Sequence, residues 1–170
     1  SGFAGLKASY FAIEAGKTIL LANKESIVTA GDILMPLADM QDSEIIPVDS
    51  EHNALYQCLP RERNLNEISK ILITASGGPF REKSLTDLKG ISLEDALKHP
   101  TWSMGAKITI DSATLVNKCL ELIEAHYLFN IPESQIEIIV HPQSIIHSMI
   151  TFIDGSTIAQ MSNPSMEVPI

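Results

Sequence analysis

Several features that identify common protein classes are scarce or missing in this sequence. Only two cysteines occur, Cys58 and Cys119, and neither belongs to a C-x-x-C pair. We therefore expect no zinc site or disulfide framework, and we expect a reducing compartment. No apolar run approaches the roughly 20 residues of a membrane span, and residues 1–7 lack the basic and apolar regions of a signal peptide. No G-x-G-x-x-G follows a predicted strand, so the fingerprint of a dinucleotide-binding domain is missing.

Basic residues are also few, because 12 lysines and arginines stand against 21 aspartates and glutamates, for a net charge of −9. This balance argues against non-specific binding to nucleic acid or to an anionic membrane. An anionic small molecule would need a local cluster of donors to bind against the overall field. The composition, with 45% apolar and 19% charged residues, is that of a globular chain, and its length predicts a single domain over residues 1–170.

Hydrophobic periodicity predicts helices and strands that alternate over much of the chain. We expect helices from residue 6 to about residue 16 and at 27–40, 53–59, 92–97 and 114–129. Strands are expected at 18–22, 44–48, 70–75, 107–110, 135–140, 145–153 and 156–161, with a tight turn at Asp154-Gly155 and a polar loop over 60–69. This order predicts a mixed α/β (α+β) fold with helices packed on one face of a mixed sheet.

The stretch D-S-E-H places two carboxylates, Asp49 and Glu51, at the end of a predicted strand. On extended backbone alternate residues point to the same face, so these two acids would repel one another unless a cation lies between them. Mg²⁺ and Mn²⁺ prefer such carboxylate oxygens. The alternative is an exposed loop with two solvated acids, which D-x-E alone favours.

The helix predicted at 114–129 makes a metal site more favourable relative to an exposed loop. Its apolar residues fall on most sides, which is typical of a buried helix, yet Asn117, Glu121 and Glu124 follow one another at i, i+4 and i+7. A polar stripe in a buried helix needs partners. Glu121 is therefore a candidate third metal ligand beside Asp49 and Glu51. An internal pair between Lys118 and Glu121 on a wetted seam explains the stripe equally well, and both interpretations stay open.

Two segments have features that favour an anion. In D-S-A-T, Asp111 or Ser112 can cap the helix that follows, and the free N–H groups of a first turn attract negative charge. In S-G-G-P-F, two glycines after a strand let backbone amides approach a ligand closely. Capping alone and turn formation alone are the commoner explanations of each segment. Ser76, the helix start and Lys118 together indicate a phosphate better than any one of them does.

Three further places carry residues with two interpretations each. The loop H-P-T-W-S-M-G holds the only tryptophan, Trp102, which either fills the core or belongs to a lid over a bound substrate. Lys24, at a strand end, either orients a substrate oxygen or pairs with Glu25. His141 and His147 flank P-Q-S-I-I, and strand histidines are more often structural than catalytic.

Several long motifs together resemble one family. They are LLANKESIVTAG, PVDSEHNA, ITASGGPFRE, HPTWSMG, KITIDSATLVNK and IVHPQSIIHSM. Through them the chain is similar to the catalytic domain of 1-deoxy-D-xylulose 5-phosphate reductoisomerases, from about Gly2 to its last residue. The resemblance implies a rearrangement of 1-deoxy-D-xylulose 5-phosphate followed by reduction with NADPH to 2-C-methyl-D-erythritol 4-phosphate, in non-mevalonate isoprenoid biosynthesis.

Carried over by position, the resemblance implies a role for each candidate residue. The Mg²⁺ or Mn²⁺ ligands would be Asp49, Glu51 and Glu121. The substrate phosphate and its surroundings would be bound by Ser76, Ser112, Asn117 and Lys118, with His99 nearby. The hydroxy-ketone end would contact Lys24 and Ser50, the lid would carry Trp102 and Met104, and His147 would join Lys24 and Glu51 as a residue needed for catalysis.

The resemblance also implies partners and limits. Members of the family begin with an NADPH-binding domain and end with a helical domain, and this sequence shows neither. We therefore expect the chain alone to bind metal and sugar phosphate but to be incomplete for turnover. A homodimer is expected from strand edges near 145–161, in the bacterial cytoplasm or the plastid stroma. The alternatives are a non-catalytic metal- and phosphate-binding or dimer-forming fragment, and a stand-alone divalent-metal aldolase or isomerase.

Overall fold

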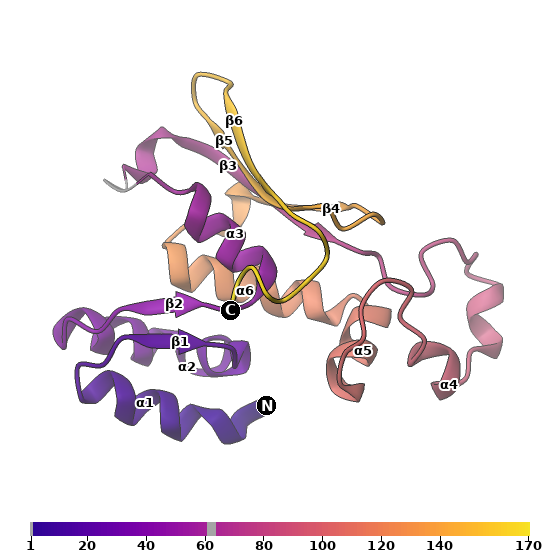
Figure 1. The fold of residues 1–170 in the computed structure, drawn as a ribbon, viewed down its shortest axis with the longest axis horizontal. Coiled ribbons are helices and arrows are strands. Elements are labelled where there is room, and N and C mark those ends of the chain that lie inside the picture. Colours follow the sequence, from indigo (N-terminus) through magenta and orange to yellow (C-terminus); the bar gives the residue numbers. More distant parts are fainter. Residues whose placement is uncertain (1, 61–63) are drawn as a thin grey trace.

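Two separate β-sheets organise the chain in the computed structural model, which describes residues 2–60 and 64–170 (Figure 1). The small sheet pairs β1 (Ile19–Leu21) in parallel with β2 (Ile45–Pro47). The large sheet has the order β4-β3-β5-β6, with bounds Ile136–Val140, Ile68–Ala75, Ile146–Phe152 and Thr157–Met161. Strand β3 is parallel to β4 and antiparallel to β5. The predicted mixed α/β fold is confirmed, although its strands form two sheets rather than one.

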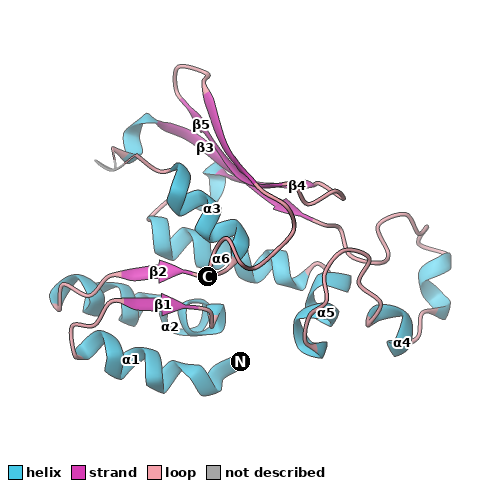
Figure 2. Cartoon of the chain, viewed as in Figure 1, coloured by secondary structure: helices cyan, strands magenta, loops and turns pink. Residues whose placement is uncertain are grey.

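The helices are distributed around these sheets (Figure 2). Their bounds are Leu6–Glu14 (α1), Lys24–Met40 (α2), Ser50–Cys58 (α3), Leu93–Ala96 (α4), Ala106–Ala113 (α5) and Val116–Phe129 (α6). Short 3₁₀ turns lie at Gly2–Gly5, Leu65–Glu67, Asp87–Gly90 and Glu133–Gln135. Helices α3 and α6 lie between the two sheets, and α1 and α2 accompany the small sheet (Figure 1).

The hydrophobic core lies where α2, α3 and α6 meet strand β3. Ile27 of α2, Leu55 of α3 and Ile71 and Ile73 of β3 are almost fully buried, and Phe129 of α6 packs with them. Burial of large aliphatic side chains is the main stabilising term in a domain of this size. The same core therefore supports the amino-terminal ends of α3 and α6, which carry the candidate site.

Most predicted strands appear within one or two residues of their expected bounds, and the Asp154-Gly155 hairpin is confirmed, with Gly155 at φ +86° between β5 and β6. The polar loop expected over 60–69 ends earlier than predicted, because β3 already begins at Ile68, and its positions 61–63 lie outside the described residues. Among the residues with described positions, no helix combines the length and apolar character needed to cross a membrane.

One predicted strand was wrong. Residues 107–110 belong to helix α5, in which the backbone N–H of Thr109 donates to the carbonyl of Gly105 at 3.1 Å. The Ile-Thr-Ile run favours a strand by propensity, but β-propensity depends strongly on context and is readily overridden by packing. As a consequence Asp111 and Ser112 end α5 and do not cap α6, whose start follows Leu115 in the left-handed region at φ 60° without a side-chain cap.

Candidate active site

The D-S-E-H stretch forms the start of a helix and not an extended strand end. Asp49 is the N-cap of α3, and its carboxylate accepts a hydrogen bond from the backbone N–H of Glu51 at 3.2 Å. An aspartate cap with a glutamate in the first turn is a favoured helix start, because both satisfy or complement the free N–H groups there. The expectation of alternate residues on extended backbone was therefore wrong, and α3 begins three residues before the predicted helix.

The two acids nevertheless meet a third. Ligand oxygens of Asp49, Glu51 and Glu121 all lie within 4.8 Å of one another. Glu121 comes from α6, whose buried positions include Lys118, Glu121 and Glu124. Several apolar side chains of α6 are exposed instead, so the helix turns its polar stripe inward. Such an arrangement needs internal partners for each charge, and the structure supplies hydrogen-bonded ion pairs to Lys118 and Glu121.

Two lysines lie among these carboxylates. Lys24 Nζ lies 2.5 Å from Asp49 Oδ2 and 3.1 Å from both Glu121 Oε1 and Asn117 Oδ1. Lys118 Nζ donates to Glu51 Oε1 at 3.0 Å, to the Thr74 carbonyl at 2.7 Å and to Glu121 Oε2. Each ammonium therefore has three acceptors. The Lys118–Glu121 pair of the second interpretation is present and belongs to the three-carboxylate cluster, while a metal-ligand role of Glu121 stays a prediction.

Lys24 does not form the alternative pair with its neighbour. The carboxylate of Glu25 accepts from Asn23 and lies 3.2 Å from Lys107 Nζ, so it is directed away from the cluster. Lys24 follows the end of β1, and Asp49 follows the end of β2. Because β1 and β2 are parallel, their carboxyl ends meet at the same edge, and this brings the lysine to the aspartate.

Burial and neighbouring charges both shift the pKa values in the cluster, and for Lys24, Lys118 and Asp49 the two effects oppose one another. Burial would lower the pKa of Lys24, but the charges of Asp49 and Glu121 outweigh it and raise the pKa. Lys118 follows the same logic, with its pKa raised by Glu121 and Glu51. Burial would raise the pKa of Asp49, yet the charge of Lys24 holds it well below the usual range. For Glu51, burial and the charge of Glu121 raise the pKa to about 7.

A cavity of about 240 Å³ opens beside the cluster. It is lined by most of the residues singled out from the sequence, namely Asp49, Ser50, Glu51, Ser76, His99, Trp102, Met104, Ser112, Asn117, Lys118 and Glu121. These residues come from segments far apart in the chain, so only the fold brings them together. The cavity lining combines carboxylates and an ammonium group with hydroxyl, amide and imidazole groups, and the amide of Asn117 contacts both Lys24 and Glu121.

The hydroxyl of Ser76 is prepared for an acceptor. His99 Nδ1 accepts from the backbone N–H groups of Thr101 and Trp102, at 3.1 and 2.9 Å, so the ring proton resides on Nε2. That N–H faces Ser76 Oγ at 2.9 Å, and the N–H of Gly78 donates to the same oxygen at 3.3 Å. With both contacts accepted by Oγ, the hydroxyl proton of Ser76 can be donated into the cavity. Burial also lowers the pKa of His99, which favours this neutral ring.

The glycine pair brings this serine to α5. Gly78 has φ +67°, and a Cβ built on it would lie 2.7 Å from the carbonyl oxygen of Ser112. A side chain at this position would therefore clash with backbone as well as strain the turn. The close approach places Ser76 and Ser112 on the same cavity, although Ser112 ends α5 and does not cap α6.

The segment around Trp102 carries no regular structure between His99 and Gly105. Trp102 is half-buried and lines the cavity together with Met104, and it is not among the residues of the hydrophobic core. Its ring lies 6.4 Å from that of His147. This position argues against a core-filling role, and the lid role stays a prediction.

His147 is a predicted site residue that does not line the cavity beside the cluster. It is buried on β5, its Nε2 lies 2.9 Å from Ser162 Oγ, and burial lowers its pKa. It lines a smaller neighbouring cavity that also touches Ser50. The structure therefore brings His147 close to the lid tryptophan but not to the three carboxylates.

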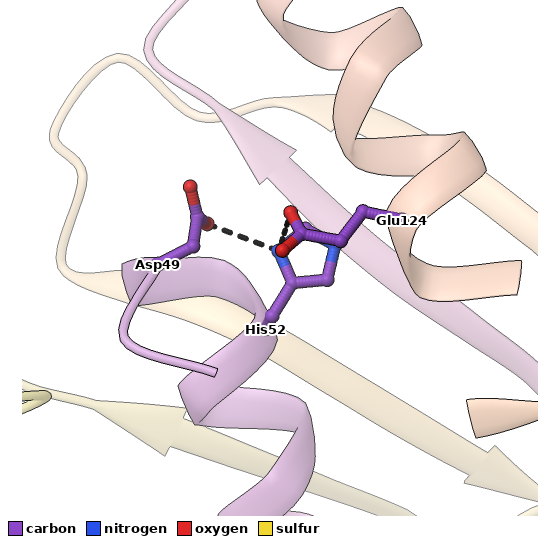
Figure 3. Close-up of side chains that lie close together, drawn as sticks. All are labelled: Asp49, His52 and Glu124. Carbon is purple, nitrogen blue, oxygen red and sulfur yellow. Dashed lines mark hydrogen bonds and ion pairs between the residues drawn. The ribbon is translucent and has the colours of Figure 1, made fainter. Parts of the chain in front are cut away.

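Two residues without a predicted role complete the cluster (Figure 3). His52 Nδ1 lies 3.0 Å from Asp49 Oδ1 and 3.4 Å from Glu124 Oε2, and Nε2 lies 2.8 Å from the backbone carbonyl of Glu121. Both His52 and Glu124 are fully buried. The spacing of Asp49 and His52, three residues apart at a helix start, could have indicated this contact. The sequence placed Glu124 on the polar stripe without giving it a partner.

The chain is similar in sequence to known proteins of one family. The family model described as 1-deoxy-D-xylulose 5-phosphate reductoisomerase C-terminal domain matches residues 45–129, and the model described as 1-deoxy-D-xylulose 5-phosphate reductoisomerase matches residues 1–31. Curated proteins of that name are 57% identical in Agathobacter rectalis, over 99% of this chain and 44% of the relative, and 56% identical in Pelotomaculum thermopropionicum, over 100% and 44%.

Solved structures of proteins with the same name are similar to this chain as well. A DOX-P reductoisomerase in complex with NADPH, fosmidomycin and magnesium is 48% identical with a TM-score of 0.94, over 99% of this chain and 43% of that one. The 1-deoxy-D-xylulose 5-phosphate reductoisomerase of Zymomonas mobilis in complex with NADPH is 51% identical with a TM-score of 0.91, again over 99% and 43%. The chain spans less than half the length of these relatives.

Fold and site together define an α/β protein in which carboxylates and lysines from separate elements converge beside a cavity that is also lined by serine hydroxyls and an imidazole. The chain belongs to the 1-deoxy-D-xylulose 5-phosphate reductoisomerase family, as the match over residues 45–129 and the relatives above show.

Proposed function

We propose that this chain provides the metal- and sugar-phosphate-binding part of a 1-deoxy-D-xylulose 5-phosphate reductoisomerase. The reaction is the rearrangement of 1-deoxy-D-xylulose 5-phosphate and its reduction with NADPH to 2-C-methyl-D-erythritol 4-phosphate, in non-mevalonate isoprenoid biosynthesis. The observation that carries the proposal is the convergence of Asp49, Glu51 and Glu121 at a cavity that Ser76 and Ser112 also line.

The donor set fits a hard divalent cation. Three carboxylates with oxygens within 4.8 Å of one another match the preference of Mg²⁺ and Mn²⁺ for oxygen ligands. We propose Asp49, Glu51 and Glu121 as the ligands. The ammonium groups of Lys24 and Lys118 contact the same oxygens, so they balance the carboxylate charge that the ion would share. A solved relative contains magnesium, which supports this choice of metal.

A bound Mg²⁺ or Mn²⁺ supplies a Lewis acid that polarises the substrate carbonyl and stabilises negative charge on oxygen. The residues of the chain act around it. Lys24 holds its proton firmly beside Asp49 and contributes its positive charge near the hydroxy-ketone, because its three N–H groups are also held by acceptors, and Ser50 lines the cavity there. Trp102 and Met104 cover the cavity and exclude water, and His147 supports the ring of Trp102.

The phosphate is assigned to the part of the cavity that the two serines line. We propose that Ser76 donates its free hydroxyl proton and that Ser112 and Asn117 add donors, while His99 holds Ser76 in place. Lys118 contributes its charge, because its three N–H groups are already held by acceptors. Binding energy from the phosphate then orients the reacting end.

NADPH is the proposed reductant, since a relative of 51% identity was solved with it. Because the chain covers 44% of the curated relatives, we propose that residues 1–170 form one catalytic domain and that the nucleotide is held mainly by the rest of such a protein. We also propose a homodimer through edge strand β6, where Ile158 and Met161 are exposed. The proposed compartment is the bacterial cytoplasm, because the relatives are bacterial and Cys58 and Cys119 are free.

Metal titration tests the proposal directly. The wild-type chain should bind one equivalent of Mn²⁺ in isothermal titration calorimetry, and Glu51→Gln should abolish or strongly weaken binding. Glu82→Gln is the matched control, because its carboxylate is exposed and lies 3.6 Å from Arg81. Absence of Mn²⁺ binding by the folded wild type, or equal binding by both variants, contradicts the proposed metal site.

A second experiment separates the candidate functions. NADPH consumption with 1-deoxy-D-xylulose 5-phosphate, on addition of a nucleotide-binding domain from a relative, supports the reductoisomerase. Metal and phosphate binding without any consumption favours a non-catalytic binding or dimer-forming fragment. Rearrangement of the carbon skeleton by the chain without nucleotide favours a stand-alone aldolase or isomerase. Light scattering of the purified chain tests the dimer, and a monomeric mass rejects it.

A further inference from the structure

We propose that Glu124 is a positioning residue, which holds the ring of His52 so that His52 in turn orients Asp49 and the α6 turn at Glu121. The inference rests on the proposed metal site and adds a support behind it. Figure 3 shows the ring of His52 between the carboxylates of Asp49 and Glu124, with dashed contacts from one ring nitrogen to both.

Glu124 is unusual among the charged residues of the cluster. It is fully buried, and neither of its carboxylate oxygens has a hydrogen-bond partner among the described residues. Its nearest charged neighbour is His52, with Nδ1 at 3.4 Å from Oε2. A buried carboxylate without hydrogen bonds is costly to fold. Position 124 therefore bears a cost that an apolar side chain would avoid, and its one ion pair within the described part of the chain is with this ring.

The ring of His52 is held at both nitrogens. A backbone carbonyl only accepts hydrogen bonds, so the contact of Nε2 with the Glu121 carbonyl, at 2.8 Å, places a proton on Nε2. Nδ1 then faces both Asp49 and Glu124. The ring also stacks on Phe129, with centroids 6.3 Å apart and planes within 10°. Its rotation is therefore restricted from every side.

This ring connects the two helices that carry the proposed ligands. His52 belongs to α3, whose N-cap is Asp49, and it contacts α6 at the carbonyl of Glu121 and at the side chain of Glu124. Residues behind metal ligands commonly set ligand orientation in this way. Loss of the Glu124 charge would loosen one of the two points at which α6 holds the ring.

The contact also decides which oxygen of Asp49 is available. Oδ1 accepts from the backbone N–H of Glu51 and lies beside His52 Nδ1. Oδ2 is left to face Lys24 and the other carboxylates. With the ring held by Glu124, Asp49 presents one defined oxygen to the proposed metal. Without it, rotation of the ring would let the carboxylate turn.

The decisive experiment compares Glu124→Gln with wild type in Mn²⁺ titrations. Glu124→Gln keeps shape and removes the charge, and we expect the Mn²⁺ dissociation constant to rise about tenfold or more. The thermal midpoint should change by less than about 3 °C, because the variant also relieves an unpartnered buried carboxylate. Glu133→Gln is the matched control, since Glu133 is an exposed glutamate 3.8 Å from His126.

Each result of the Mn²⁺ titrations either supports or overturns the inference about Glu124. Unchanged Mn²⁺ affinity in Glu124→Gln, with normal binding by wild type, overturns the inference and leaves the proposed function standing. No Mn²⁺ binding by wild type overturns both. A second Mn²⁺ in wild type that the variant loses also overturns the inference, because Glu124 would then be a ligand together with Asp49 and His52.

A measurement on the wild-type chain covers the case in which the variant does not fold. Side-chain ¹⁵N spectra should show His52 protonated at Nε2, and addition of Mg²⁺ should shift its Nδ1 resonance through Asp49. The ring of His126 on α6, which bonds the Ile131 carbonyl just beyond the end of that helix, should not shift. A His52 ring that bound Mg²⁺ leaves unchanged contradicts the proposed link to Asp49.

Discussion

Nζ of Lys24 lies 2.5 Å from Oδ2 of Asp49, and both side chains are largely buried. The pair joins the ends of two parallel strands, β1 and β2, to the start of α3. It also gives the proposed metal site a permanent positive neighbour. The stability of the chain and the chemistry of the cavity therefore depend on the same contact.

Removal of the Lys24 charge should destabilise the chain strongly. Lys24→Met keeps the length of the side chain but leaves Asp49 and Glu121 without their ammonium, and breaking one side of a buried pair costs roughly 3–5 kcal/mol. Urea denaturation measures the loss. Lys70→Met is the control, because its pair with Glu137 is exposed and should contribute at most about 1 kcal/mol. Equal losses of unfolding free energy in the two variants would show that the buried pair stabilises the chain no more than the exposed pair does.

The metal-free chain should lose stability as the pH rises from about 5 to about 9. The pKa of Glu51 is raised to about 7 by burial and Glu121. The pKa of His52 is raised to about 9, because the charge of Glu124 and the bond to Asp49 outweigh its burial. Both groups bind protons more tightly when folded. The stability that each group contributes is fully present below its pKa in the unfolded chain. It is lost as the pH rises through the pKa of the same group in the folded chain.

Denaturation in EDTA at about pH 5, 7 and 9 tests this dependence. Glu51→Gln should reduce the slope of the lower half of the curve, to which Glu124 also contributes because burial raises its pKa to about 7, and should leave the upper half, which His52 controls. A free energy of unfolding that rises over the same range would contradict the assigned directions. Bound Mg²⁺ should reduce the dependence, because a cation favours the ionised carboxylates.

Gly78→Ala should weaken the binding of a sugar phosphate, an effect that its backbone strain alone does not explain. The added Cβ would lie 2.7 Å from the Ser112 carbonyl, so Ser76 and Ser112 must separate. Gly155→Ala is the matched control, with φ +86° but nothing within 4 Å of the new Cβ. Strain should cost both variants about 1–2 kcal/mol. Only Gly78→Ala should also lose binding of a sugar phosphate in calorimetry, and equal binding by both variants would remove Ser76 from the proposed site.

Trp102 should report occupancy of the cavity. It is the only tryptophan of the chain and lines the cavity beside Met104. A sugar phosphate added with Mg²⁺ should change its fluorescence, because closure of the segment would alter the water around the indole. The corresponding unphosphorylated sugar is the control and should leave the emission unchanged. A spectrum insensitive to saturating sugar phosphate would contradict the lid role.

Local patterns predicted much of the architecture. The strands around Ile71 and Ile150 and the Asp154-Gly155 turn follow from hydrophobic runs and turn chemistry, which act between neighbours in the chain. Local patterns failed at residues 107–110, where the β-branched run forms α5. They also placed Asp49 and Glu51 on extended backbone, whereas an aspartate cap begins α3 at this point.

The sequence by itself determined which residues were worth attention, including the acids of D-S-E-H, the polar stripe of α6 and the serine before the glycine pair. Only the tertiary structure decided that the Lys118–Glu121 pair and the three-carboxylate cluster are one arrangement, and that His147 lies apart from it. It also joined His52 to Glu124. The reason is physical: a charge in water needs no partner, whereas burial between two packed helices requires one, and which partner is available depends on contacts between distant parts of the chain.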